Sequence, residues 1–233
     1  MITRRHVFFA APLLAAAGPA FAQSPQCAVV TKARQAAMTP DQALQELKDG
    51  NARLLAGKSV NCDLMAQVRD TSTFQAPFAA IVGCIDSRVP PELIFDQTIG
   101  DVFAARIAGN FVNTDIIGSL EFATKVAGAK LIVVLGHSEC GAVKGAIDHV
   151  KLGNLTATLK NIEPAVQSVK GVPGDRNSGN KAFVQAVADA NVRIAARNLT
   201  SRSPVLRGMV AAKSLRIATA MHDISTGRVT FFA

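Results

Sequence analysis

The sequence predicts an α/β fold in which helices flank a mostly parallel central β-sheet. From Phe78 onward, short apolar runs typical of buried strands alternate with segments of helical periodicity, which is the pattern of β–α–β units. Two of these runs are followed directly by Cys and His residues, and ligand sites form at the carboxyl ends of strands in an open parallel sheet. The residues before and after this alternating region predict an N-terminal helical arm and a C-terminal hairpin at the edge of the sheet.

The elements of the repeat follow in chain order. Three apolar, β-prone runs predict the strands, namely Phe78–Gly83, Val102–Ile107 and Leu131–Leu135. Three amphipathic segments predict helices: Ile116–Ala127, closed by Gly128; Ser138–Val150; and Lys181–Asn198. The polar, glycine-rich stretch 171–180 is typical of a loop. The edge hairpin is expected from Ser214–His222 and Arg228–Phe232.

The arm is expected to cover residues 23–74 and to precede one α/β domain over residues 75–233, which carries these Cys and His residues. Thr39-Pro40-Asp41-Gln42 predicts a helix start, because it combines a capping hydroxyl, a first-turn proline and a glutamine at the capping-box position. An apolar stripe of leucines follows; we expect it to be interrupted near Gly50 and to end near Gly57. The arm is expected to pack on a partner subunit or across its own domain.

Residues 1–22 predict a cleaved export signal. Arg4 and Arg5 precede a short apolar stretch, and Ala20-Phe21-Ala22 is a small-x-small cleavage site. Both an ordinary secretory signal and a twin-arginine signal fit, and either predicts an exported, periplasmic protein. No later segment offers about 20 uninterrupted apolar residues, so no stable membrane insertion is expected after cleavage.

The charge pattern argues against nucleic-acid binding. The formal net charge is +8, but the cationic residues are scattered and the chain contains no Trp or Tyr that would give a basic stripe its stacking platforms. A solvated surface is the better interpretation.

Cys27 and Cys62 are expected to form a disulfide that clamps the arm. Both lie in polar surroundings near the predicted mature N-terminus, and an exported protein meets an oxidising compartment. The alternative is a pair of unrelated surface thiols.

Cys84, His137 and Cys140 predict a zinc site with one ion per subunit. Two thiolates and an imidazole suit zinc, whereas magnesium or calcium would require oxygen ligands. Three protein ligands leave one tetrahedral position open, as in catalytic rather than structural zinc sites. The alternatives are a small buried cysteine and a hydrogen-bonded core histidine.

Asp86 and Arg88 predict a catalytic pair beside the metal. Alternation along an extended segment would place both on the side of Cys84, and Arg88 could hold the Asp86 carboxylate through a bidentate contact. Asp86 could then accept a hydrogen bond from a zinc-bound water. Because two thiolates offset the zinc charge, the water is expected to ionise at a higher pH than in a three-histidine site. The alternative is a surface salt bridge.

Seven motifs together resemble the β-class carbonic anhydrases. In order along the chain they are Cys84–Glu92, Phe95–Gln97, Gly100–Phe103, Ala108–Asn110, Gly118–Phe122, Val134–Val143 and His222–Val229. The resemblance implies an enzyme (a lyase, carbonate dehydratase) in which zinc-bound hydroxide attacks CO₂ to give bicarbonate and a proton.

The resemblance also implies an assembly and a substrate pocket. It implies a homodimer, often paired into a tetramer, with the N-terminal arm reaching over the partner. Gln75 matches a glutamine that enters the partner's substrate pocket, and Phe103 and Ala108 match its apolar lining. Gly141 is expected to allow close approach to the backbone. Two alternatives share the zinc ligands: a hydrolase of carbonyl sulfide or carbon disulfide, and a non-catalytic zinc-binding protein.

Overall fold

The computed structural model describes residues 27–232, so the predicted export signal lies outside the described residues. Its strands are β1 (Ala79–Gly83), β2 (Val102–Arg106), β3 (Leu131–His137), β4 (Arg216–His222) and β5 (Val229–Phe231). Its α-helices are α1 (Lys32–Ala37), α2 (Pro40–Leu55), α3 (Leu64–Thr71), α4 (Pro91–Ile94), α5 (Thr114–Glu121), α6 (Gly141–Ile147), α7 (Gly153–Lys160), α8 (Glu163–Ser168), α9 (Lys181–Arg202) and α10 (Pro204–Ala211).

The five strands form one sheet in the order β2-β1-β3-β4-β5. The first four are parallel, and β5 pairs antiparallel with β4 as the predicted edge hairpin. Every residue of β1 and β3 is buried, whereas β2 is an edge strand and only partly covered. The predicted α/β fold class is therefore confirmed, and the two most deeply buried strands lie side by side.

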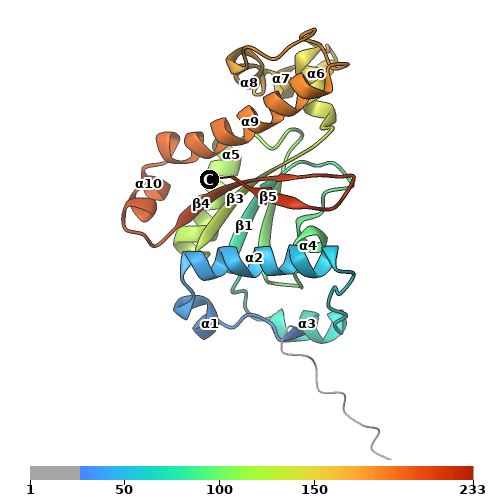
Figure 1. The fold of residues 1–233 in the computed structure, drawn as a ribbon. Coiled ribbons are helices and arrows are strands. Elements are labelled where there is room, and N and C mark those ends of the chain that lie inside the picture. Colours follow the sequence, from blue (N-terminus) through green and yellow to red (C-terminus); the bar gives the residue numbers. More distant parts are fainter. Residues whose placement is uncertain (1–26, 233) are drawn as a thin grey trace, which may run out of the picture.

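Helices cover both faces of this sheet. Figure 1 shows α2 across one face and α9 across the other. The side chains of Leu44 and Leu47 from α2 are buried in the same hydrophobic core as the strands, so this part of the arm packs across its own domain. Among residues 27–232, none of the helices combines the length and the apolar character needed to cross a bilayer.

The structure confirms the helix start at Thr39 and corrects the expected interruption near Gly50. The Thr39 hydroxyl accepts a hydrogen bond from the Gln42 amide, and the Gln42 side chain accepts one from the Thr39 amide, which completes a capping box. α2 then runs through Gly50 without a break to Leu55. A Cβ at Gly50 would lie 1.7 Å from the Phe95 carbonyl oxygen, so this glycine serves close packing and not helix termination.

Two predicted helices differ from the structure. The helix expected over 116–127 is α5 followed by a π-helical turn (Phe122–Val126), in which the Ala127 amide donates to the carbonyl of Phe122, five residues earlier. The helix expected from Ser138 begins only at Gly141. β3 continues to His137 because it pairs with β4 along its whole length, and Glu139 then turns the chain with a positive φ of 58°.

Cys27 and Cys62 form a disulfide, with their Cα atoms 5.4 Å apart. The side-chain amide of Gln67, a fully buried residue of α3, donates a hydrogen bond to the Cys27 carbonyl at 3.0 Å. The disulfide and this hydrogen bond together join the start of the described chain to α3.

Candidate metal centre

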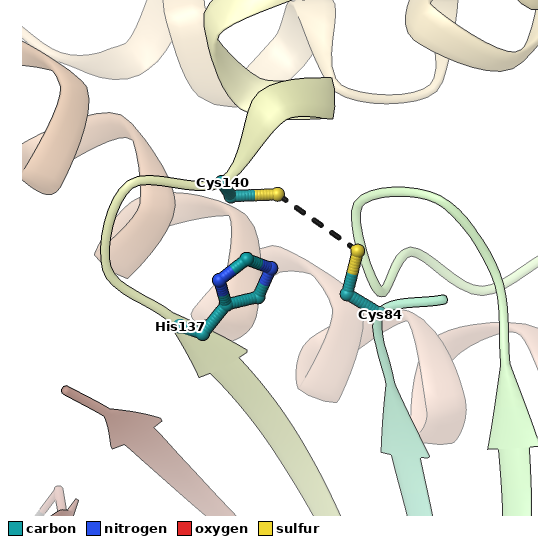
Figure 2. A group of neighbouring side chains, drawn as sticks. All are labelled: Cys84, His137 and Cys140. Carbon is teal, nitrogen blue, oxygen red and sulfur yellow. Dashed lines mark hydrogen bonds between the residues drawn. The ribbon is translucent and has the colours of Figure 1, made fainter. Parts of the chain in front are cut away.

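Cys84, His137 and Cys140 meet at the carboxyl ends of β1 and β3. Cys84 follows β1, His137 ends β3, and Cys140 directly precedes α6 (Figure 2). Because β1 and β3 are parallel neighbours, residues 53 positions apart in sequence reach the same edge of the sheet. One potential ligand atom from each side chain lies within 4.8 Å of the others, and all three side chains are buried. The structure therefore brings together the three predicted metal ligands.

The geometry of this cluster fits a tetrahedral metal ion. The two sulfurs are 4.0 Å apart, and two sulfurs each about 2.3 Å from a zinc ion at a tetrahedral angle would be about 3.8 Å apart. The Nδ1 of His137 lies 2.9 Å from the Ser138 carbonyl oxygen, which can only accept, so the ring proton resides on Nδ1. Nε2 then carries a lone pair, is buried, and has no hydrogen-bond partner among the described residues. A metal ion would satisfy this atom, and the Ser138 contact is the outer support usual for ligating histidines.

The two thiols are electrostatically unequal. A hydrogen bond from Cys140 lowers the pKa of Cys84, and the hydrogen bond from the Gly109 amide lowers it further. The same contact raises the pKa of Cys140, and burial raises it further. One proton is therefore shared by this pair, and binding of a metal to both thiolates has to release it.

The Cys84 sulfur is also held from the loop after β2. The Gly109 amide donates to it at 3.3 Å, and the Gly109 carbonyl accepts a hydrogen bond from the buried Asn191 side chain of α9 at 2.7 Å. Our sequence reasoning missed Asn191 as a site residue. The sequence does hold a signal for it: Asn191 follows Val187 by four residues, which places a polar side chain on the buried face of the helix.

Asp86 and Arg88 form the predicted bidentate pair, but the backbone between them is a turn and not an extended segment. Arg88 Nε donates to Asp86 Oδ1 at 3.0 Å, and Arg88 Nη2 donates to Oδ2 at 2.8 Å. The expected extended segment is wrong: the Val89 amide donates to the Asp86 carbonyl and the Arg88 amide donates to Asp86 Oδ1, so the chain turns here. The turn places both ends of the pair on one side without strand alternation.

The pair keeps a carboxylate charged beside the ligand cluster. Hydrogen bonds from Arg88 hold the pKa of Asp86 well below its usual range. Asp86 Oδ2 lies 3.9 Å from His137 Nε2, the atom with the free lone pair. An ionised acceptor is thus fixed next to the position available to a metal ion.

The other predicted site residues are more dispersed. Gln75 precedes β1 and Cys84 follows it, so the two residues lie at opposite ends of this strand. Phe103 lies in β2 and contacts Phe122 edge-on, with ring centroids 6.3 Å apart; both line a pocket of about 480 Å³. Ala108 precedes the amide that contacts Cys84. A Cβ at Gly141 would meet open space, so the expected close approach is not made by this chain itself.

One further side chain at the site was missed. Arg106, the last residue of β2, donates hydrogen bonds to the carbonyl oxygens of Cys84 and Asp86. Nothing in its local sequence distinguishes it from any other arginine at the end of a strand.

Comparisons with known proteins agree with this geometry. The family model described as carbonic anhydrase matches residues 79–229. Carbonic anhydrase 2 of Mycobacterium tuberculosis is 35% identical over 192 residues, covering 81% of this chain and 91% of that protein. The carbonic anhydrase of Mycolicibacterium smegmatis is 34% identical over 195 residues, covering 82% and 92%.

Solved structures show the same fold. A Coccomyxa β-carbonic anhydrase in complex with acetazolamide superposes with a TM-score of 0.64 at 24% identity, covering 81% of this chain and 84% of that chain. One of two tetrameric β-carbonic anhydrases from the ascomycete Sordaria macrospora gives a TM-score of 0.59 at 26% identity, covering 83% and 98%. The chain therefore belongs to the carbonic anhydrase family, in its β class.

Proposed function

We propose that this chain binds one zinc ion through Cys84, His137 and Cys140 and hydrates CO₂ reversibly to bicarbonate and a proton. Membership of the carbonic anhydrase family supports the reaction. The observation that carries the assignment to this site is the buried Nε2 of His137. It has no hydrogen-bond partner within residues 27–232, lies near two thiols, and is 3.9 Å from an ionised carboxylate.

The donor set supports zinc. Two sulfurs and one imidazole nitrogen are borderline-soft ligands, which disfavours magnesium and calcium. When bound, zinc supplies a Lewis acid that lowers the pKa of a water molecule. Because the two thiolates offset the charge of the ion, we expect turnover to increase above neutral pH.

Asp86 orients the attacking water, and Arg88 holds Asp86 in place. The Asp86 carboxylate accepts a hydrogen bond from that water and orients it. Arg88 holds both carboxylate oxygens, so that Asp86 stays ionised and does not move into the ligand cluster.

The substrate pocket requires a second copy of the chain. Gln75 and Cys84 lie at opposite ends of β1, whose five residues alone span about 17 Å at about 3.3 Å per residue. Gln75 can therefore serve this site only in a partner subunit. The edge position of β2 and the 48% exposure of Phe122 beside it support a homodimer through this face, and two such dimers could pair into a tetramer.

Export to the periplasm is part of the proposal. The Cys27–Cys62 disulfide supports it, because structural disulfides persist in oxidising compartments and are rare in the cytosol. The predicted signal at residues 1–22 would direct this export.

Stopped-flow CO₂ hydration across pH, with zinc per subunit assayed in the same sample, tests the function. We expect one zinc per chain and chelator-sensitive turnover that increases above neutral pH. Full zinc without CO₂ turnover would refute the proposal. Turnover of carbonyl sulfide or carbon disulfide in the same sample would then identify a hydrolase, and no turnover of any of the three gases would identify a non-catalytic zinc protein.

A further inference from the structure

The side chain of Arg106 bridges two backbone carbonyls at the metal centre. Its Nε donates to the Cys84 carbonyl oxygen at 2.8 Å, and its Nη2 donates to the Asp86 carbonyl oxygen at 2.7 Å. In the sheet register Arg106 pairs with Gly83, so its side chain begins beside the point where the chain leaves β1. One guanidinium thus holds the backbone on both sides of Ile85.

This segment needs support from outside itself. Ile85 is 60% exposed, so the packing of its side chain contributes little to fixing the loop. Cys84 and Asp86 also lie beyond the end of β1 and are not held by strand pairing. Hydrogen bonds from a charged donor are roughly twice as strong as neutral ones, and the planar guanidinium presents its donors in a fixed geometry. The two contacts therefore constrain the distance between the two carbonyls as well as their positions.

We infer that Arg106 is a positioning residue for the metal centre, which fixes the Cys84 sulfur and the Asp86 carboxylate relative to each other. This role rests on the proposed function, which assigns a metal to Cys84 and a part in the reaction to Asp86. Arg106 contacts the backbone and neither reacting side chain, so it acts through the loop. A misplacement of about 1 Å at a reacting group can lower a rate about 100-fold.

A general effect on stability has to be separated from positioning, and Arg176 offers a matched control. Its Nη1 donates to the Val169 carbonyl at 2.7 Å, and its Nη2 donates to the Val166 carbonyl at 2.8 Å. It is thus a second arginine that bridges two carbonyls, at the end of α8 and outside the metal centre.

The experiment compares Arg106→Met, Arg106→Lys and Arg176→Met with the parent enzyme. Zinc affinity is measured by chelator competition, and ligand geometry is followed in the absorption spectrum of the cobalt-substituted protein. The kcat is measured at saturating zinc, and Tm is measured by thermal unfolding. For Arg106→Met we expect zinc affinity to fall about 10- to 100-fold, as for other residues that support metal ligands. We also expect an altered cobalt spectrum and a lowered kcat. Arg106→Lys should recover part of each loss, because its ammonium can donate to one carbonyl.

Arg176→Met should lower Tm while zinc affinity and kcat stay within about twofold of the parent. The inference would be overturned if Arg106→Met had the zinc affinity and the cobalt spectrum of the parent, whatever its Tm. Should Arg106→Met not fold, unchanged zinc affinity in Arg106→Lys would overturn it equally. A parent that binds zinc without hydrating CO₂ would refute the proposed function, but the affinity and the spectrum would still test Arg106.

Discussion

Opening the Cys27–Cys62 disulfide should lower the free energy of unfolding by about 4 kcal/mol. The bond joins residues 35 positions apart and closes a loop that contains α1 and α2. In the chain-entropy description, a cross-link removes entropy from the unfolded chain in proportion to the logarithm of loop length. For this loop the loss is about 13 cal/mol/K, which is about 4 kcal/mol at 25 °C. That is a large share of the 5–15 kcal/mol typical of domains.

Urea unfolding of the same protein, oxidised and reduced with a phosphine, measures this quantity. Both samples retain all four sulfur atoms, so the comparison isolates the bond from the packing of Cys27, which is only 3% exposed. Zinc has to be held at one free concentration, because a metal bound only by the folded state adds to its stability. A Cys27→Ala/Cys62→Ala variant is the control and should not respond to the reductant.

A difference below about 1 kcal/mol between the oxidised and reduced samples would refute this reasoning. It would mean that the unfolded chain is not appreciably constrained by the cross-link. The arm would then be held by folded-state contacts, such as the hydrogen bond from the Gln67 amide to the Cys27 carbonyl and the two from the Gln35 amide to the carbonyls of Pro77 and Ala127.

Three further substitutions test the structure. Arg88→Met removes the hydrogen bonds that hold the pKa of Asp86 below its unfolded value of about 3.9. The difference in free energy of unfolding between the parent and Arg88→Met should therefore be largest above that pH and should decrease as the pH falls. A difference that is independent of pH in urea unfolding between pH 2 and 7 would contradict this. Gly50→Ala should destabilise by about 3 kcal/mol, because its Cβ meets the rigid Phe95 carbonyl. Gly208→Ala lies at an exposed position of α10, where the new Cβ meets no other part of the described chain within 4 Å, and should instead stabilise by about 0.5–1 kcal/mol. Equal shifts in the two Tm values would contradict the packing argument.

Local pattern was enough to predict much of the fold. The strand containing Leu131–Leu135 and the helix beginning at Thr39 are both present, because apolar runs and capping residues act within a few positions of chain. The boundaries that failed depend on neighbours: β3 extends to His137 through its pairing with β4, and α2 continues through Gly50 because it packs on α4. Strand pairing and helix packing override local preference at such points.

The residue pattern alone predicted the candidate metal ligands, since two cysteines and a histidine placed after two strands indicate both a donor set and an edge of the sheet. The surroundings of these side chains become visible only in the folded chain: within residues 27–232 Nε2 of His137 has no hydrogen-bond partner, the sulfurs of Cys84 and Cys140 are in hydrogen-bond contact, and Arg106 and Asn191 hold the surrounding backbone. The physical reason is range. Ligand types and strand ends are encoded in contiguous residues, whereas a hydrogen bond across 82 positions, such as that from Asn191 to the Gly109 carbonyl, exists only once the chain has folded.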